Sequence, residues 1–179
     1  MDLVVALGGI PGAFFFLILS IPIPYTTKSN VSMKKNIQET ELSYYGLYLL
    51  NYLREHRFTE AKDLSFVKSR ADRAAEIYEQ ARREGYTTEG AQELAMADLM
   101  RGLHYPKYDL LIEVLEREFD REVPEAKCTT FAEKLLPLID NVFSIYDLTD
   151  DFFAQSPEYD LLYSELTGAV ILYLEEYGI

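Results

Sequence analysis

The fold class is decided by residues 44–53, which read YYGLYLLNYL. Tyrosines return there at every fourth position, and leucines fill much of the surface between them. A helix that is apolar over most of its circumference lies at the centre of its fold. We therefore predict a central helix from about Glu39 to His56. Glycine is a poor residue for a helix interior, so we interpret Gly46 as the point where a second helix approaches closely.

Five further segments show the period of an amphipathic helix. Apolar residues return at every third or fourth position, and capping residues, Gly or Pro separate the segments. We expect these helices from about Leu64 to Glu84, from the caps Thr87 and Thr88 to Gly102, after Pro106, from a capping box formed by Thr130 and Glu133, and from Ser156 and Pro157 to Gly178. No stretch after Met33 alternates as a strand would. The sequence predicts an all-α, single compact bundle-like domain of five to six helices within residues 33–179.

An apolar segment precedes this domain. Residues 3–24 carry no charged side chain, but no positive residue stands before them and three prolines interrupt them. A secretory signal has a positive start, and prolines break a spanning helix. We predict that translation begins at Met33, that residues 1–32 are a misassigned extension, and that the protein is cytoplasmic. The alternatives are a membrane anchor, which would leave a membrane-tethered helical domain, and an export signal.

The charge balance limits which kinds of molecule the protein is expected to bind. The chain has 30 acidic and 17 basic residues, a formal net charge of −13. Such a surface repels nucleic-acid phosphates and anionic lipids, so we expect no direct nucleic-acid binding and no membrane contact unless residues 3–24 are translated. A basic protein partner suits this charge. The single cysteine, Cys128, excludes an intrachain disulfide and fits a reducing compartment. The oligomeric state stays open.

One short stretch combines groups suited to acid–base chemistry. His104, Lys107, Tyr108 and Asp109 bring a titratable imidazole beside an amine, a phenol and a carboxylate. The same stretch also reads as an ordinary joint between helices, because glycine and proline punctuate it. We favour the interpretation as a structural joint. The alternative function is a small enzyme that uses this cluster for acid–base chemistry.

The sequence predicts no metal and no cofactor. Asp147, Thr149, Asp151 and Glu158 follow the register of a calcium-binding loop, but Phe152 occupies the position where that loop needs glycine. Those acids serve equally well as helix caps. A phosphate-binding loop, a dinucleotide fingerprint and a zinc pattern are all missing from the sequence.

A charged face of the fourth predicted helix is the candidate interaction surface. Its carboxylates come from Glu113, Glu116, Asp120 and Glu122. Tyr105 and Tyr108 precede them and supply amphipathic side chains of the kind enriched at interfaces. The alternative interpretation is a helix face that is merely solvated.

Several blocks of the chain resemble domain-of-unknown-function family 1896. The blocks are residues 41–50 (ELSYYGLYLL), 89–96 (EGAQELAM), 101–109 (RGLHYPKYD), 156–160 (SPEYD), 165–170 (ELTGAV) and 177–178 (YG). The resemblance implies a small all-helical bacterial protein, encoded within conjugative transposons, with no assigned activity and no catalytic residues. Together these features predict a non-enzymatic accessory or adaptor protein of a mobile element, which binds a protein partner through its acidic surface.

Overall fold

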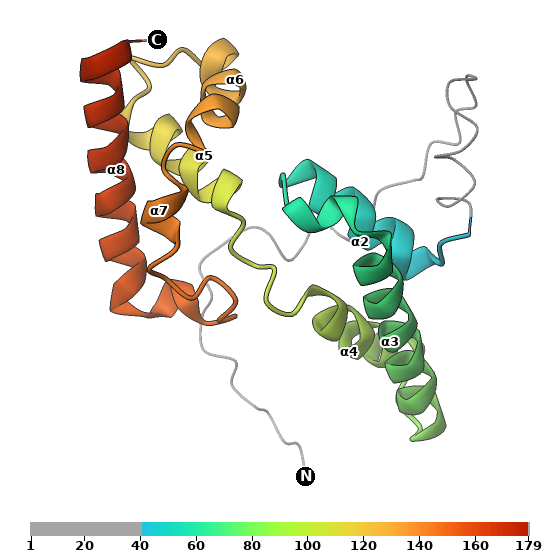
Figure 1. Cartoon of the computed structure of the whole chain (residues 1–179). Coiled ribbons are helices and arrows are strands. Elements are labelled where there is room, and N and C mark those ends of the chain that lie inside the picture. Colours follow the sequence, from blue (N-terminus) through green and yellow to red (C-terminus); the bar gives the residue numbers. More distant parts are fainter. Residues whose placement is uncertain (1–40, 179) are drawn as a thin grey trace, which may run out of the picture.

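The computed structural model describes residues 41–178, so the apolar residues 3–24 and the predicted start at Met33 lie outside them. Within the described residues the chain forms seven α-helices, two short 3-10 helices and no strand, which confirms the all-α prediction. The elements are α2 (Tyr44–Glu55), η1 (Thr59–Lys62), α3 (Leu64–Arg83), α4 (Thr88–Met100), α5 (Lys107–Glu118), α6 (Glu125–Leu135), α7 (Asp140–Phe143), η2 (Phe153–Gln155) and α8 (Pro157–Tyr177) (Figure 1). No helix in this part of the chain has the length and apolar character needed to cross a bilayer.

Side-chain caps set the starts of the first three α-helices. The Ser43 hydroxyl accepts a hydrogen bond from the backbone N–H of Gly46, and the Asp63 carboxylate and the Thr87 hydroxyl do the same for α3 and α4. Each cap satisfies an N–H group that has no partner inside its helix. Because Ser43 is the cap, α2 begins at Tyr44, later than the sequence predicted.

The predicted capping box at Thr130 and Glu133 is wrong. Helix α6 already begins at Glu125, directly after Pro124, so Thr130 lies inside the helix. The fixed φ of proline suits the entry to a helix, and the charge of Glu125 favours its first turn. A Thr and a Glu three residues apart also occur within helices, and here they do not mark the start of a helix. The interruption expected at Pro137 is present, since α6 ends at Leu135.

The buried residues form two clusters, one on each side of the α4–α5 joint (Figure 1). The N-terminal cluster comes mainly from α2, α3 and α4 and includes Leu49, Leu53, Val67, Ala71 and Leu99. The C-terminal cluster comes from α5, α6, α7, η2 and α8 and includes Leu111, Leu115, Phe143, Phe153 and Leu166. The sequence predicted the compact helical fold but gave no sign of this division.

The close approach predicted at Gly46 is confirmed. A Cβ atom on Gly46 would lie 3.6 Å from the Cβ of Ala71 on α3 and 3.2 Å from the side chain of Leu42. A small residue on each helix therefore lets α2 and α3 pack tightly.

Candidate functional site

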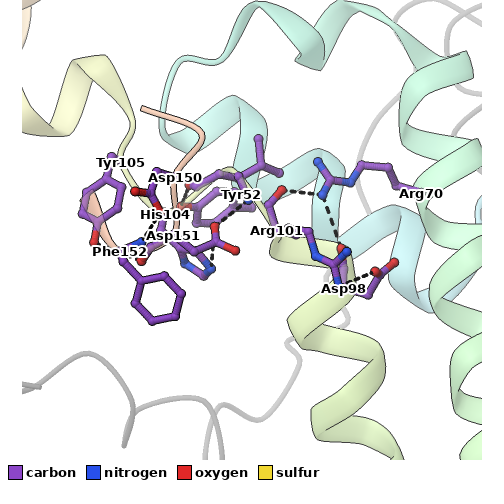
Figure 2. A network of polar contacts seen from close by, with 11 residues as sticks. Tyr52, Arg70, Asp98, Arg101, His104, Tyr105, Asp150, Asp151 and Phe152 are labelled. Atoms are coloured by element: carbon purple, nitrogen blue, oxygen red, sulfur yellow. Dashed lines mark hydrogen bonds and ion pairs between the residues drawn. The ribbon is translucent and has the colours of Figure 1, made fainter. Parts of the chain in front are cut away.

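The joint between α4 and α5, residues 101–106, collects polar contacts from both halves of the molecule (Figure 2). Gly102 ends α4 with a φ of +72°, and its N–H donates to the Asp151 carboxylate at 2.7 Å. The Tyr105 hydroxyl donates to the backbone carbonyl of Asp151. On the other side, the Tyr52 hydroxyl donates to the carbonyl of Leu103 at 2.8 Å. The joint is thus fastened to α2 and to the segment before α8.

Tyr52 acts here as a hydrogen-bond donor and not as a base. Burial raises the pKa of this phenol far above its ordinary value, and the nearby Asp109 carboxylate raises it further. A proton that is so hard to remove stays on the oxygen, where the Leu103 carbonyl accepts the hydrogen bond.

A buried carboxylate at the end of α4 pairs with two arginines, and a third arginine binds the backbone beside it. Asp98 is only 8% exposed. Arg73 binds it with two nitrogens, Nε at 2.9 Å from one carboxylate oxygen and Nη2 at 3.1 Å from the other, and Arg101 adds a contact at 3.0 Å. Arg70 donates to the backbone carbonyls of Asp98 and Arg101. This arrangement neutralises the buried charge and satisfies carbonyls that the end of a helix leaves without partners.

An open groove of about 510 Å³ lies over these arginines, lined by Asp63, Ser65, Phe66, Ser69, Arg70, Arg73, Asp98 and Arg101. Three guanidinium groups face two carboxylates there, so the groove is locally basic on an acidic chain. Burial lowers the pKa of Arg70, yet a guanidinium keeps its proton at neutral pH. The groove therefore presents fixed positive charge suited to pairing with an anionic group.

A second set of polar contacts links the two clusters at the end of α2. His56 Nδ1 lies 2.5 Å from the Asp109 carboxylate of α5. Arg57 pairs with Glu133 of α6 at 2.7 Å, and its guanidinium lies over the ring of Tyr108. The hydrogen bond with Asp109 raises the pKa of His56, although burial opposes this. His56 was not among the residues that the sequence singled out.

The four predicted catalytic residues face four different partners. His104 is half-exposed and lies 3.6 Å from Asp151, and Lys107 pairs with Asp140 at 2.6 Å. Tyr108 lies under Arg57, and Asp109 binds His56. Groups that act together on one substrate must point toward a shared atom. These side chains instead fasten the joint to its neighbours.

The predicted interaction residues divide into two kinds. Glu113 accepts a hydrogen bond from the Tyr159 hydroxyl of α8 at 3.0 Å and pairs with Arg117. Tyr105 and Tyr108 are half-buried in the contacts described above. The carboxylates left exposed are those of Glu116, Asp120 and Glu122.

Asp147 and Asp151, which follow the register of a calcium-binding loop, instead accept hydrogen bonds from nearby backbone groups. Asp147 accepts hydrogen bonds from the backbone N–H and the hydroxyl of Thr149, which lower the pKa of its carboxyl. Asp151 accepts from Gly102, as described above. Between residues 41 and 178, no three His, Cys, Asp or Glu side chains are placed to hold one ion.

Cys128 lies in the C-terminal cluster, where burial raises the pKa of its thiol and the carboxylates of Glu116 and Glu125 raise it further. A nucleophilic cysteine needs the opposite shift. The environment of Cys128 is that of a packing residue.

We predict that the stability of the protein depends on pH through His56. Because the pKa of His56 is raised in the folded state, its contribution is complete below the ordinary value near 6.5 and is lost as pH rises through the raised value. The free energy of unfolding, measured by urea titration between about pH 6 and 8, should therefore fall with pH. An Asp109→Asn variant should lose this slope. A His104→Gln variant should keep it, and an unchanged slope in Asp109→Asn would contradict the assignment.

Comparisons with known proteins agree with the fold. A family model described as "Domain of unknown function (DUF1896)" matches residues 37–179. The structure titled "Crystal structure of protein PG0816 from Porphyromonas gingivalis" matches with a TM-score of 0.69 and 41% sequence identity, over 80% of this chain and 97% of that chain. The comparison with curated proteins found no match.

Proposed function

The chain belongs to the family described as domain of unknown function 1896, and from this premise we propose that it is a non-enzymatic accessory or adaptor protein that binds a basic protein partner through its acidic surface. The setting in a bacterial mobile element is part of the proposal, and its support is the family resemblance. A cytoplasmic location is also part of it.

The observation that carries the proposal is a group of exposed carboxylates at the end of α5. Glu116, Asp120 and Glu122 are exposed, and none of them forms an ion pair with another residue of the range 41–178. They stand on a chain whose net charge is −13. Exposed carboxylates attract a basic partner over a distance and speed its association.

The separation of the predicted catalytic residues supports a binding role over the alternative enzyme. His104, Lys107 and Asp109 each have a different carboxylate or imidazole as partner, so the geometry gives no common point of attack on a substrate. The membrane-tethered alternative depends on residues 3–24, which lie outside the described residues.

The test is affinity capture of partners with the tagged full chain from its native host, followed by binding measurements with the purified partner. We expect Glu116→Lys, Asp120→Lys and Glu122→Lys together to weaken binding at low salt by about tenfold or more. The difference should shrink as salt rises through about 0.15 M, where the screening length is about 8 Å.

A matched control reverses three exposed carboxylates of α3 and α4 instead, in Glu76→Lys, Glu79→Lys and Glu93→Lys. The net charge changes equally, so a specific surface predicts near-normal binding for this control. Equal losses of binding in both triple variants, or undiminished binding in the first, would show that the α5 carboxylates have no specific role. Turnover of a small substrate that His104→Ala abolishes would make the protein an enzyme.

A further inference from the structure

The side of helix α8 opposite its buried face carries a row of exposed residues that is mostly apolar and also includes Ser164. Leu162, Leu166 and Val170 point into the C-terminal cluster. On the opposite side, Leu161 is 57% exposed and Leu172 67% exposed. A surface helix normally carries polar residues there. Figure 1 shows α8 at the edge of the molecule, with α5, α6 and α7 all on one side of it.

Gly168 lies in the middle of this outer row. Its spacing of seven residues from Leu161 and four from Leu172 places all three on one side of the helix. A Cβ atom on Gly168 would meet no atom of the described residues 41–178 within 4 Å. Close packing within the described chain therefore gives no reason for the glycine, although glycine is among the poorest helix formers. A glycine between two leucines makes a shallow notch into which a second helix can pack.

The charges on α8 determine which kind of partner helix can pack against its outer row. Its five charged residues are all acidic, namely Glu158, Asp160, Glu165, Glu175 and Glu176. Asp160 and Glu165 lie on the two edges of the outer row, and Glu175 lies at its end. A second copy of this chain would bring the same acids against them, and an anionic membrane would also be repelled. Lysine or arginine beside an apolar row would be attracted on both edges.

We propose that the outer row of α8, defined by Leu161, Gly168, Ile171 and Leu172, is the docking site for an amphipathic helix of a partner protein, with lysine or arginine on both sides of its apolar face. This mode of recognition lays the apolar side of a helix into an apolar surface and leaves its charges at the rim. The inference rests on the proposed function and assigns both the surface and the chemistry of the partner.

The test uses a synthetic helical peptide of about 18 residues, long enough to form a helix, with leucine at the core-facing positions and lysine elsewhere. A peptide of the same pattern with glutamate in place of lysine is its control. We expect the full chain to bind the Leu/Lys peptide, measured by fluorescence anisotropy, and not the Leu/Glu peptide. Gly168→Leu and Leu172→Gln should each weaken binding by about tenfold or more, the loss typical of a central interface residue.

Two controls separate docking from folding. Gly168→Leu should melt no lower than the parent chain, because the site is open and leucine forms helices better than glycine. Ile145→Gln, which changes an exposed apolar residue outside α8, should bind the peptide normally.

Several outcomes would overturn the inference. Unchanged binding in Gly168→Leu and Leu172→Gln, or equal binding of both peptides, would remove α8 as the site. Failure of the Leu/Lys peptide to bind would do the same. A dimer of the chain, or binding to anionic vesicles, that Gly168→Leu abolishes would assign the row to a second copy or to a membrane. If only the α5 triple variant loses the peptide, the inference fails while the proposed function stands.

Discussion

Replacing Phe153 with alanine should lower the free energy of unfolding by about 3–5 kcal/mol, the range measured for deleting a buried phenylalanine ring. Phe153 is 1% exposed. The rings of Tyr105, Tyr146 and Tyr159 stand around it edge to face, with centroids 5.6, 6.1 and 6.0 Å away. Such ring pairs add about 0.5–1.5 kcal/mol each beyond the area they bury. Urea denaturation followed by far-ultraviolet circular dichroism measures the loss.

The neighbouring residue is a matched control. Phe152 has the same side chain but is 67% exposed. Phe152→Ala should therefore change the free energy of unfolding by no more than about 0.5 kcal/mol. Phe153→Leu, which keeps most of the buried volume, should fall between the two. Equal effects at positions 152 and 153 would mean that the aromatic cluster around Phe153 does not support the fold.

The helices were predictable from the sequence because their signals are local. Asp63 and Thr87 cap the helices that follow them, and Pro157 occupies the first position of α8. Each of these residues acts on backbone groups within one turn of itself, so its effect is readable in a short window. The false start at Thr130 fails for the same reason, since a local pattern cannot exclude a helix that began earlier at Glu125.

The polar contacts between helices were not predictable, because their partners are far apart in the chain. His56 and Asp109 are 53 residues apart. Glu113 looked like a free surface acid, but Tyr159 donates to it from another helix. Asp98 was not among the residues considered in the sequence, and two arginines from α3 converge on that end of the helix. Only the packing of the helices determines which polar side chains meet, and no local period encodes it.

The polar contacts between the N-terminal and C-terminal clusters have a consequence for function. His56–Asp109 and Arg57–Glu133 are contacts between charged or titratable groups, whereas the clusters themselves are apolar. The outer row of α8 and the α5 carboxylates both belong to the C-terminal half. Both proposed binding sites thus lie in the half of the molecule that does not contain the arginine groove.

Replacing Asp98 with alanine should lower the free energy of unfolding by about 2–4 kcal/mol, somewhat less than the cost of breaking a fully buried ion pair. The expected loss is smaller than for a fully buried pair because the side chains of Arg73 and Arg101 are each 63% exposed, and water can partly solvate them. The change leaves Arg73 and Arg101 close together without the carboxylate that pairs with them, while Arg70 keeps its backbone partners. Asp98→Asn, which keeps a hydrogen-bond acceptor but loses the charge, should cost less. Urea titration at low salt measures both.

Whether Asp98→Ala lowers or raises the stability shows which matters more, the local pairing with arginines or the net negative charge of the chain. On a chain of net charge −13, removing one acid should relieve repulsion and stabilise the fold if only the total charge mattered. Asp72→Ala is the control, because Asp72 forms an exposed pair with Lys68 whose loss costs at most about 1 kcal/mol. A destabilised Asp98→Ala beside a nearly unchanged Asp72→Ala would show that the arginine cluster, and not the excess of acids, sets the stability of this half. If the two variants behaved alike, the pairing of Arg73 and Arg101 with Asp98 would not contribute to the stability of the fold.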